Sequence, residues 1–236
     1  MIGDASAPIL SQQLLVTVAE QLKMPLLQLA RQAELGQLAG KADLAAMQTT
    51  ADTALRLIDN YVLGVRLSLD QDQLELEPIS VSSVLYDSGH ELSKLARGYG
   101  VDLELHVGGR YSTVMANRHG LQSALVSLGA ALIEALPALE VPQLKLQLAA
   151  HRCRYGIVAG LYSETEQLTS EALRGGRALV GASRQPLGTL THTAGAGVFV
   201  ADAILKAMQL TLKASRHHNL YGLGTTLQPN HQLQLI

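Results

Sequence analysis

Residues 44–65 read LAAMQTTADTALRLIDNYVLGV, with apolar side chains at alternating spacings of three and four residues. This seven-residue repeat is typical of a helix that presents one apolar stripe to another helix. Residues 14–38 have a similar helical spacing, and the segment around Gly36 and Gly40 separates the two stretches. The pattern predicts an antiparallel helical hairpin whose apolar seam needs a cover.

The cover is either the rest of the chain or a second copy of the hairpin. Because the seam is long and uninterrupted, we expect two copies to pair into a dimeric four-helix bundle. The residues expected along this dimer seam are Leu15, Val18, Leu22, Leu44, Met47, Ala51, Ile58 and Tyr61.

The composition excludes several classes of protein. The chain has 236 residues, a net charge of −2 and 3% aromatic residues, which argues against a nucleic-acid-binding protein. A single cysteine, Cys153, excludes a disulfide framework and a cysteine-rich metal site. No Lys or Arg precedes Lys23, and the longest uncharged run, residues 185–201, is too polar for a membrane span. We therefore expect a cytoplasmic protein without a membrane partner.

The rest of the chain alternates between strand and helix patterns. Residues 74–78 form a short strand or linker, and Ser80 begins a helix that stops at Gly98 and Gly100. Further strands are expected over 101–107, 112–116, 144–149, 155–162, 209–215, 223–228 and 232–236, and helices over 120–136, 164–174 and 198–208. The predicted fold class is α+β, with a helical hairpin domain over 1–70 and an α/β sandwich domain over 78–236.

The order of these segments resembles the core of sensor histidine kinases. Ala19-Glu-Gln-Leu-Lys-Met-Pro-Leu26 resembles the family's phosphoacceptor box, which reads Ser-His-Glu-Leu-Arg-Thr-Pro-Leu in typical members. Residues 121–136 correspond to the helix that carries the N box, Gly195-Ala-Gly197 to the glycine-rich box of the lid, and Gly224-Thr-Thr-Leu227 to the closing strand. The resemblance covers residues 11–230 and implies a dimerisation hairpin followed by a sandwich of the ATPase type.

The chain departs from the family at each functional box. Glu20 stands where the phosphoacceptor histidine belongs, and a carboxylate cannot replace an imidazole nucleophile. Ser127 and Ala131 replace the two N-box amides, residues 162–166 lack the glycines of the adenine box, and Phe199 replaces the third lid glycine. The resemblance thus implies a pseudokinase without a bound cofactor. Its vestigial pocket comprises Ser127, Ala131, Gly195, Gly197, Gly224 and Thr225.

The resemblance also implies a function. In the family, the hairpin face around the phosphoacceptor box docks the receiver domain of a response regulator. The residues expected on that face here are Glu20, Lys23, Met24 and Leu27. We expect a non-catalytic, homodimeric scaffold or regulator in two-component signalling, which binds a partner such as a receiver domain.

Two other functions stay open at this point. One is an ATP-independent histidine phosphotransferase relay, against which stands the absence of histidine between Met1 and Ser88. The other is an ATP-binding protein with a rebuilt pocket. His90-Glu-Leu matches a phosphoacceptor box superficially, but without the proline, so we expect His90 to be a surface histidine on a helix.

His217-His218 is the candidate metal-binding pair. Neighbouring side chains on a strand point to opposite faces of a sheet, so the two imidazoles are poorly placed to share one ion. We therefore expect an exposed turn here and no metal site.

Overall fold

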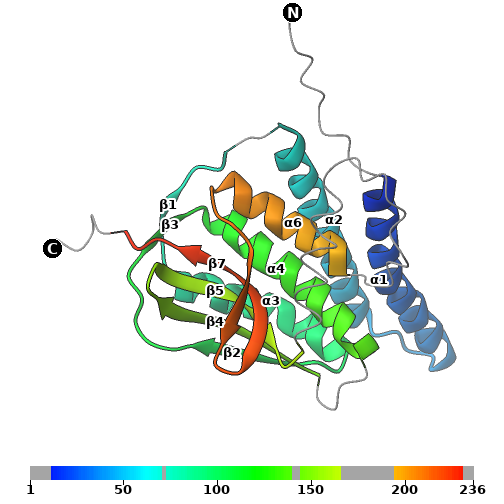
Figure 1. Cartoon of the computed structure of the whole chain (residues 1–236). Coiled ribbons are helices and arrows are strands. Elements are labelled where there is room, and N and C mark those ends of the chain that lie inside the picture. The colour runs from blue at the N-terminus through cyan, green and yellow to red at the C-terminus, as the bar shows by residue number, and fades with distance from the viewer. Residues whose placement is uncertain (1–11, 71–72, 140–143, 166–193, 231–236) are drawn as a thin grey trace, which may run out of the picture.

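A computed structural model describes residues 12–70, 73–139, 144–165 and 194–230 (Figure 1). Nearly all of the helix expected over 164–174, and the strand expected over 232–236, lie outside these residues. Within them, no helix combines the length and the apolar character needed to cross a membrane.

Two long helices, α1 (Gln12–Leu38) and α2 (Leu44–Asp70), pack against each other at the N-terminal end of the described chain (Figure 1). The connection between them turns at Gly40, which has a φ of 67°, a conformation that favours glycine. Asp43 then caps α2, because its side chain accepts a hydrogen bond of 3.0 Å from the backbone N–H of Ala46.

The remaining elements build two sheets and a helical layer. In chain order they are β1 (Glu77–Ile79), α3 (Val81–Gly98), β2 (Asp102–Val107), β3 (Val114–Ala116), α4 (Arg118–Ala135), the 3-10 helix Leu136–Leu139, β4 (Lys145–Cys153), β5 (Gly156–Ser163), α6 (Ala194–Ala207), β6 (Lys213–His217) and β7 (Leu220–Leu227). β1 and β3 form a small antiparallel pair, and the main sheet has the order β2-β4-β5-β7-β6. Only β2 and β4 pair in parallel within the main sheet.

Capping residues fix where the helices of this part begin. Ser80 accepts a hydrogen bond of 3.4 Å from the backbone N–H of Ser83, as expected from a serine at the start of α3. Asn117 does the same for α4, through a hydrogen bond of 2.8 Å from Gly120. The predicted start of α3 is confirmed, and α4 begins two residues before the predicted position because Asn117 caps it.

The two faces of the main sheet have different covers. Along β4, Leu146 and Leu148 belong to the main core, which they share with α3, α4 and α6. The alternating residue Ala149 points to the opposite face, which we call the outer face. Val158 and Tyr162 of β5 are also buried outside the main core, and the β6–β7 hairpin covers them (Figure 1).

The inner side of α2 belongs to the main core. Leu57, Tyr61 and Leu67 are buried in it, and Gly64 allows α2 to approach α6 so closely that an added Cβ would lie 3.1 Å from Val200. The ranges predicted as separate domains, 1–70 and 78–236, therefore share one core in this structure.

The placement of Tyr61 corrects the predicted dimer seam. Its side chain is only 6% exposed, because α2 turns this face toward α6 and α4 of its own chain. The other predicted seam residues are distributed differently: Leu44 and Ile58 are exposed, Met47 and Ala51 are half-buried, Val18 and Leu22 pack partly against the core, and the side chain of Leu15 lies outside the described part.

Burial of Tyr61 predicts a measurable pH dependence. Desolvation, followed by the nearby carboxylate of Glu134, raises the pKa of the Tyr61 hydroxyl well above its ordinary value. Its contribution to stability is therefore complete below pH 10 and is lost as the pH rises further, because the unfolded chain releases the proton first. We expect Tyr61→Phe to lose less stability than the wild type between pH 9.5 and 11.5 in urea titrations.

The matched control is Tyr86→Phe, since Tyr86 lies on the surface of α3. It is expected to follow the wild-type profile. Identical profiles for all three proteins would contradict the burial of Tyr61.

Candidate functional site

The predicted vestigial pocket is largely an interface between two helices. Ser127 and Ala131 lie on α4, Gly197 lies on α6, and all three are buried. An added Cβ at Gly197 would lie 2.5 Å from the backbone oxygen of Ser127 and 2.7 Å from the Cβ of Ala131. The structure thus brings these three predicted residues together, by packing α6 directly onto α4.

The glycines of the predicted lid box occupy a different local structure from the expected one. Gly195 and Gly197 were expected in a loop before a helix that starts at Val198, but α6 already begins at Ala194. The expectation is wrong because residues 196–201 are buried on every side of the helix, and that burial outweighs the low helix propensity of glycine. Phe199, at the position of the third lid glycine, is fully buried in the core.

The other two pocket residues lie in the sheet. Gly224 pairs with Gly160 of β5, and an added Cβ would lie 3.2 Å from the Tyr162 hydroxyl on the outer face. Thr225 is buried, and its hydroxyl has no hydrogen-bond partner among the described residues. The Ser127 hydroxyl is also buried and has no hydrogen-bond partner among the described residues. Neither group supplies the amide or carboxylate that the resemblance requires for nucleotide and magnesium.

The predicted partner-binding residues follow one another on α1. Positions 20, 23, 24 and 27 share a face at helical spacing. Lys23 is exposed and Leu27 is 52% exposed, whereas the side chains of Glu20 and Met24 lie outside the described part. The described members of this face are therefore accessible to a partner.

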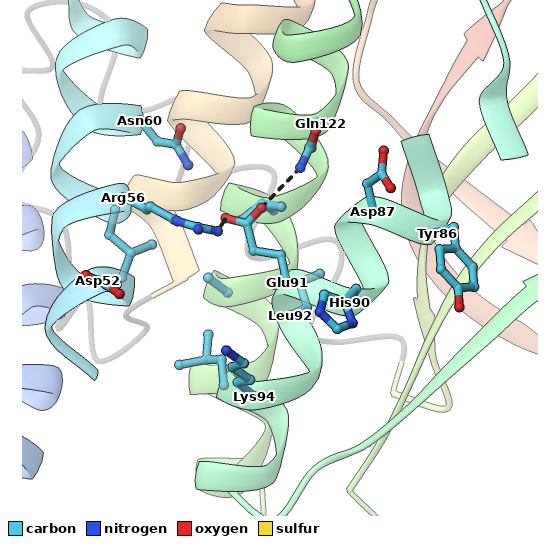
Figure 2. Close-up of a pocket in the computed structure, with 14 residues that line it drawn as sticks. Asp52, Arg56, Asn60, Tyr86, Asp87, His90, Glu91, Leu92, Lys94 and Gln122 are labelled. Carbon is cyan, nitrogen blue, oxygen red and sulfur yellow. Dashed lines mark hydrogen bonds and ion pairs between the residues drawn. The ribbon is translucent and has the colours of Figure 1, made fainter. Parts of the chain in front are cut away.

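A groove of about 570 Å³ lies between α2, α3 and α4 (Figure 2). Glu91 of α3 lies at its centre, and its carboxylate is 3.0 Å from the Arg56 guanidinium of α2. The same carboxylate accepts a hydrogen bond of 3.2 Å from the side-chain amide of Gln122 on α4. At one end, Arg118 forms an ion pair of 2.7 Å with Asp87. These ion pairs of Glu91 and Asp87 join α2 and α4 to α3, and Asp52 and His90 also line the groove.

Sequence reasoning missed this groove. Glu91 lies 35 residues after Arg56 and 31 residues before Gln122, and a single charged residue on a helix carries no sign of its partner. The structure places His90 at the rim of the groove as an exposed side chain, in agreement with the prediction of a surface histidine.

The second cluster that the sequence did not predict lies on the outer face of the sheet. His217 ends β6, and His218 begins the turn to β7 with a φ of 53°. Because His218 is outside the strand and in a left-handed conformation, the alternation of faces does not apply to the pair. The prediction that the two rings point apart is therefore wrong: both lie next to His106 of β2, with ring centroids 5.1 and 5.8 Å from it.

The environment of His217 favours a neutral ring. Its side chain is 7% exposed. Desolvation, and then the imidazoles of His151, His218 and His106, lower the pKa of His217 to about 4. Desolvation followed by His218 also lowers the pKa of His151, whose Nδ1 atom is buried without a hydrogen-bond partner among the described residues.

Comparison with known proteins gives a fold but no family. No protein-family model matches the chain, and no curated protein matches it. Among solved structures, the chain is similar to the histidine kinase AdeS of Acinetobacter baumannii, with a TM-score of 0.51 and 15% identity over 89% of this chain and 98% of that one. The chain has a histidine-kinase-like fold.

A second structure agrees with this result. Full-length ShkA in complex with AMPPNP has a TM-score of 0.53 and 14% identity over 79% of this chain. The present chain covers 38% of ShkA. The histidine-kinase-like fold matches the mixed α and β architecture and the resemblance of the sequence to sensor histidine kinases.

Proposed function

We propose that this histidine-kinase-like protein is a non-catalytic, dimeric scaffold in two-component signalling that binds a receiver domain of a response regulator. The observation that carries the proposal is the surface of α1, where Lys23 and Leu27 are exposed on the helical face that includes position 20, at which the sequence has glutamate where the resemblance calls for the phosphoacceptor histidine. Such a face retains groups for docking without the nucleophile that phosphotransfer needs.

The chemistry of this face fits the proposed partner. Leu26 and Leu27 offer exposed apolar area on α1 that a partner could cover. Lys23 adds a positive charge that complements the acidic phosphorylation pocket of a receiver domain. A carboxylate at Glu20 does not accept a phosphoryl group from that pocket as an imidazole does. Docking on this face would therefore be stoichiometric binding without phosphotransfer.

The loss of catalysis has separate support in the packing of α6 on α4. Where the resemblance calls for two amides, the interface holds Ser127 and Ala131, and Gly197 lies directly against both. Isothermal titration calorimetry with ATP and Mg²⁺ is expected to show no binding. A micromolar affinity would contradict the non-catalytic proposal and favour an ATP-binding protein with a rebuilt pocket.

Receiver docking can be tested with a matched pair of double variants. Lys23→Glu combined with Leu27→Ala is expected to weaken binding to a purified receiver domain from the same genome at least tenfold, because it removes both the charge and the apolar contact. Biolayer interferometry with the immobilised receiver measures the change.

The control is Lys41→Glu combined with Leu38→Ala, which makes the same changes at exposed positions near the other end of α1. It is expected to bind like the wild type. Equal weakening by both double variants, or by neither, would remove the assignment of the docking face to Lys23 and Leu27.

A further inference from the structure

Three histidine side chains converge where the tip of the β6–β7 hairpin lies over β2 (Figure 1). We propose that His106, His217 and His218 bind a divalent transition-metal ion, with Zn²⁺ as the representative ion. This site is independent of the receiver-docking face on α1 and of the α4–α6 interface.

The distances between the rings suit shared coordination. One nitrogen from each of the three rings lies within 4.8 Å of the others. The Nε2 atom of His217 and the Nδ1 atom of His106 are 3.2 Å apart. Two imidazole nitrogens on one tetrahedral zinc ion lie about 3.4 Å apart, given zinc–nitrogen bonds of about 2.0–2.1 Å. This pair is therefore already at ligand spacing, and only His218 must move closer.

The position of His218 makes that movement easy. It is exposed and occupies the two-residue turn between β6 and β7, so its ring can rotate without disturbing buried atoms. The same exposure gives an ion access from solvent and leaves room for water as a fourth ligand. His217, by contrast, is buried and holds its nitrogen in place.

The donor set selects the type of ion. The cluster contains imidazole nitrogens and no carboxylate or thiolate. Imidazole suits zinc, copper and nickel, whereas magnesium and calcium prefer oxygen ligands. His151 adds a further nitrogen beside the cluster, since its ring stacks on that of His217 with centroids 4.8 Å apart and its Nδ1 atom has no partner among the described residues.

The ion would connect two strands that the sheet keeps apart. β2 and β6 are opposite edges of the order β2-β4-β5-β7-β6, yet His106 and His217 meet across the outer face. A shared metal ion would bind the folded chain and not the unfolded one, and so would stabilise the contact between the hairpin and β2.

Thermal unfolding of the full chain, after treatment with EDTA and dialysis, tests the site directly. At a free Zn²⁺ concentration of about one hundred times Kd, Tm is expected to rise by roughly 5–10 °C. Calorimetry is expected to give one ion per chain with micromolar or tighter affinity. Co²⁺ in place of Zn²⁺ is expected to give the visible absorption of a four-coordinate site.

The variant His218→Asn removes one ligand and keeps a residue that tolerates positive φ, so it is expected to fold normally and to bind Zn²⁺ at least tenfold more weakly. His106→Gln serves as a second ligand variant with the same expected result. His90→Asn alters an exposed histidine on α3 and is expected to leave the affinity unchanged.

Two outcomes would overturn the proposal. The first is no zinc-dependent change in Tm together with an affinity weaker than about 100 μM, far below that of structural zinc sites. The second is tight binding that neither His106→Gln nor His218→Asn weakens, which would place the ion elsewhere.

Discussion

Replacing Gly197 by alanine is expected to lower the free energy of unfolding by about 2–3 kcal/mol, as is typical of overpacking in a close-packed interior. The added Cβ would lie 2.5 Å from the backbone oxygen of Ser127. A backbone oxygen in the middle of α4 cannot rotate away as a flexible side chain can, so α6 must shift as a whole. The higher helix propensity of alanine offsets about 1 kcal/mol of the cost of overpacking. The expected loss of about 2–3 kcal/mol is the net effect of the two.

Urea unfolding followed by far-UV circular dichroism measures the effect. Gly98→Ala is the matched control, because Gly98 is also helical but an added Cβ there would meet no atom within 4 Å. The control is expected to be neutral or to stabilise the protein by up to about 1 kcal/mol. If Gly197→Ala behaved like this control, α6 would not lie directly on Ser127 and Ala131, and their packing would no longer count against a nucleotide site.

The combination Leu55→Glu and Val62→Glu is expected to convert a wild-type dimer into a monomer. Leu55 is 58% exposed and Val62 is 45% exposed, and they lie seven residues apart on α2, with Ile58 between them and Leu69 one further repeat away. This outer stripe is exposed, whereas Leu57 and Tyr61 of the same helix are buried in the core.

A helix with both a buried and an exposed apolar face needs two covers. The chain itself covers the inner face, and the seven-residue spacing of the outer stripe suits the same stripe of a second copy. Burying two added carboxylates at such an interface costs several kcal/mol per copy, enough to abolish a typical micromolar association.

Multi-angle light scattering at micromolar concentration distinguishes the two states. The wild type is expected at twice the chain mass and the double variant at the chain mass. Tyr86→Glu introduces the same charge at an exposed aromatic residue of α3 and is expected to remain dimeric. A monomeric wild type would contradict the four-helix-bundle proposal and leave the outer stripe of α2 to another partner.

The positions of several elements could be predicted because the signals are local. The serine at Ser80 marks the start of α3, and strict alternation over residues 101–107 marks β2. The predicted strand pair over 144–149 and 155–162 corresponds to β4 and β5, which pair antiparallel as expected. In each case the residues that determine the element are neighbours in the chain.

The predictions failed where a residue's surroundings come from distant segments. Gly195 and Gly197 look like a loop locally, but both belong to α6, in which Gly197 packs against α4. Tyr61 follows the seven-residue repeat of an exposed seam, but α6 covers it.

The succession of helices and strands, the resemblance to sensor histidine kinases and the replacement of a histidine by Glu20 can be read from the amino-acid sequence. The buried face of α2 and the meeting of the histidines depend instead on how distant segments pack. Periodicity records how a residue relates to its neighbours along the chain, whereas the meeting of His106 with His217 depends on how the hairpin crosses the outer face of the sheet. The positive φ of His218, which no pattern of apolar residues reveals, then places a third imidazole beside them.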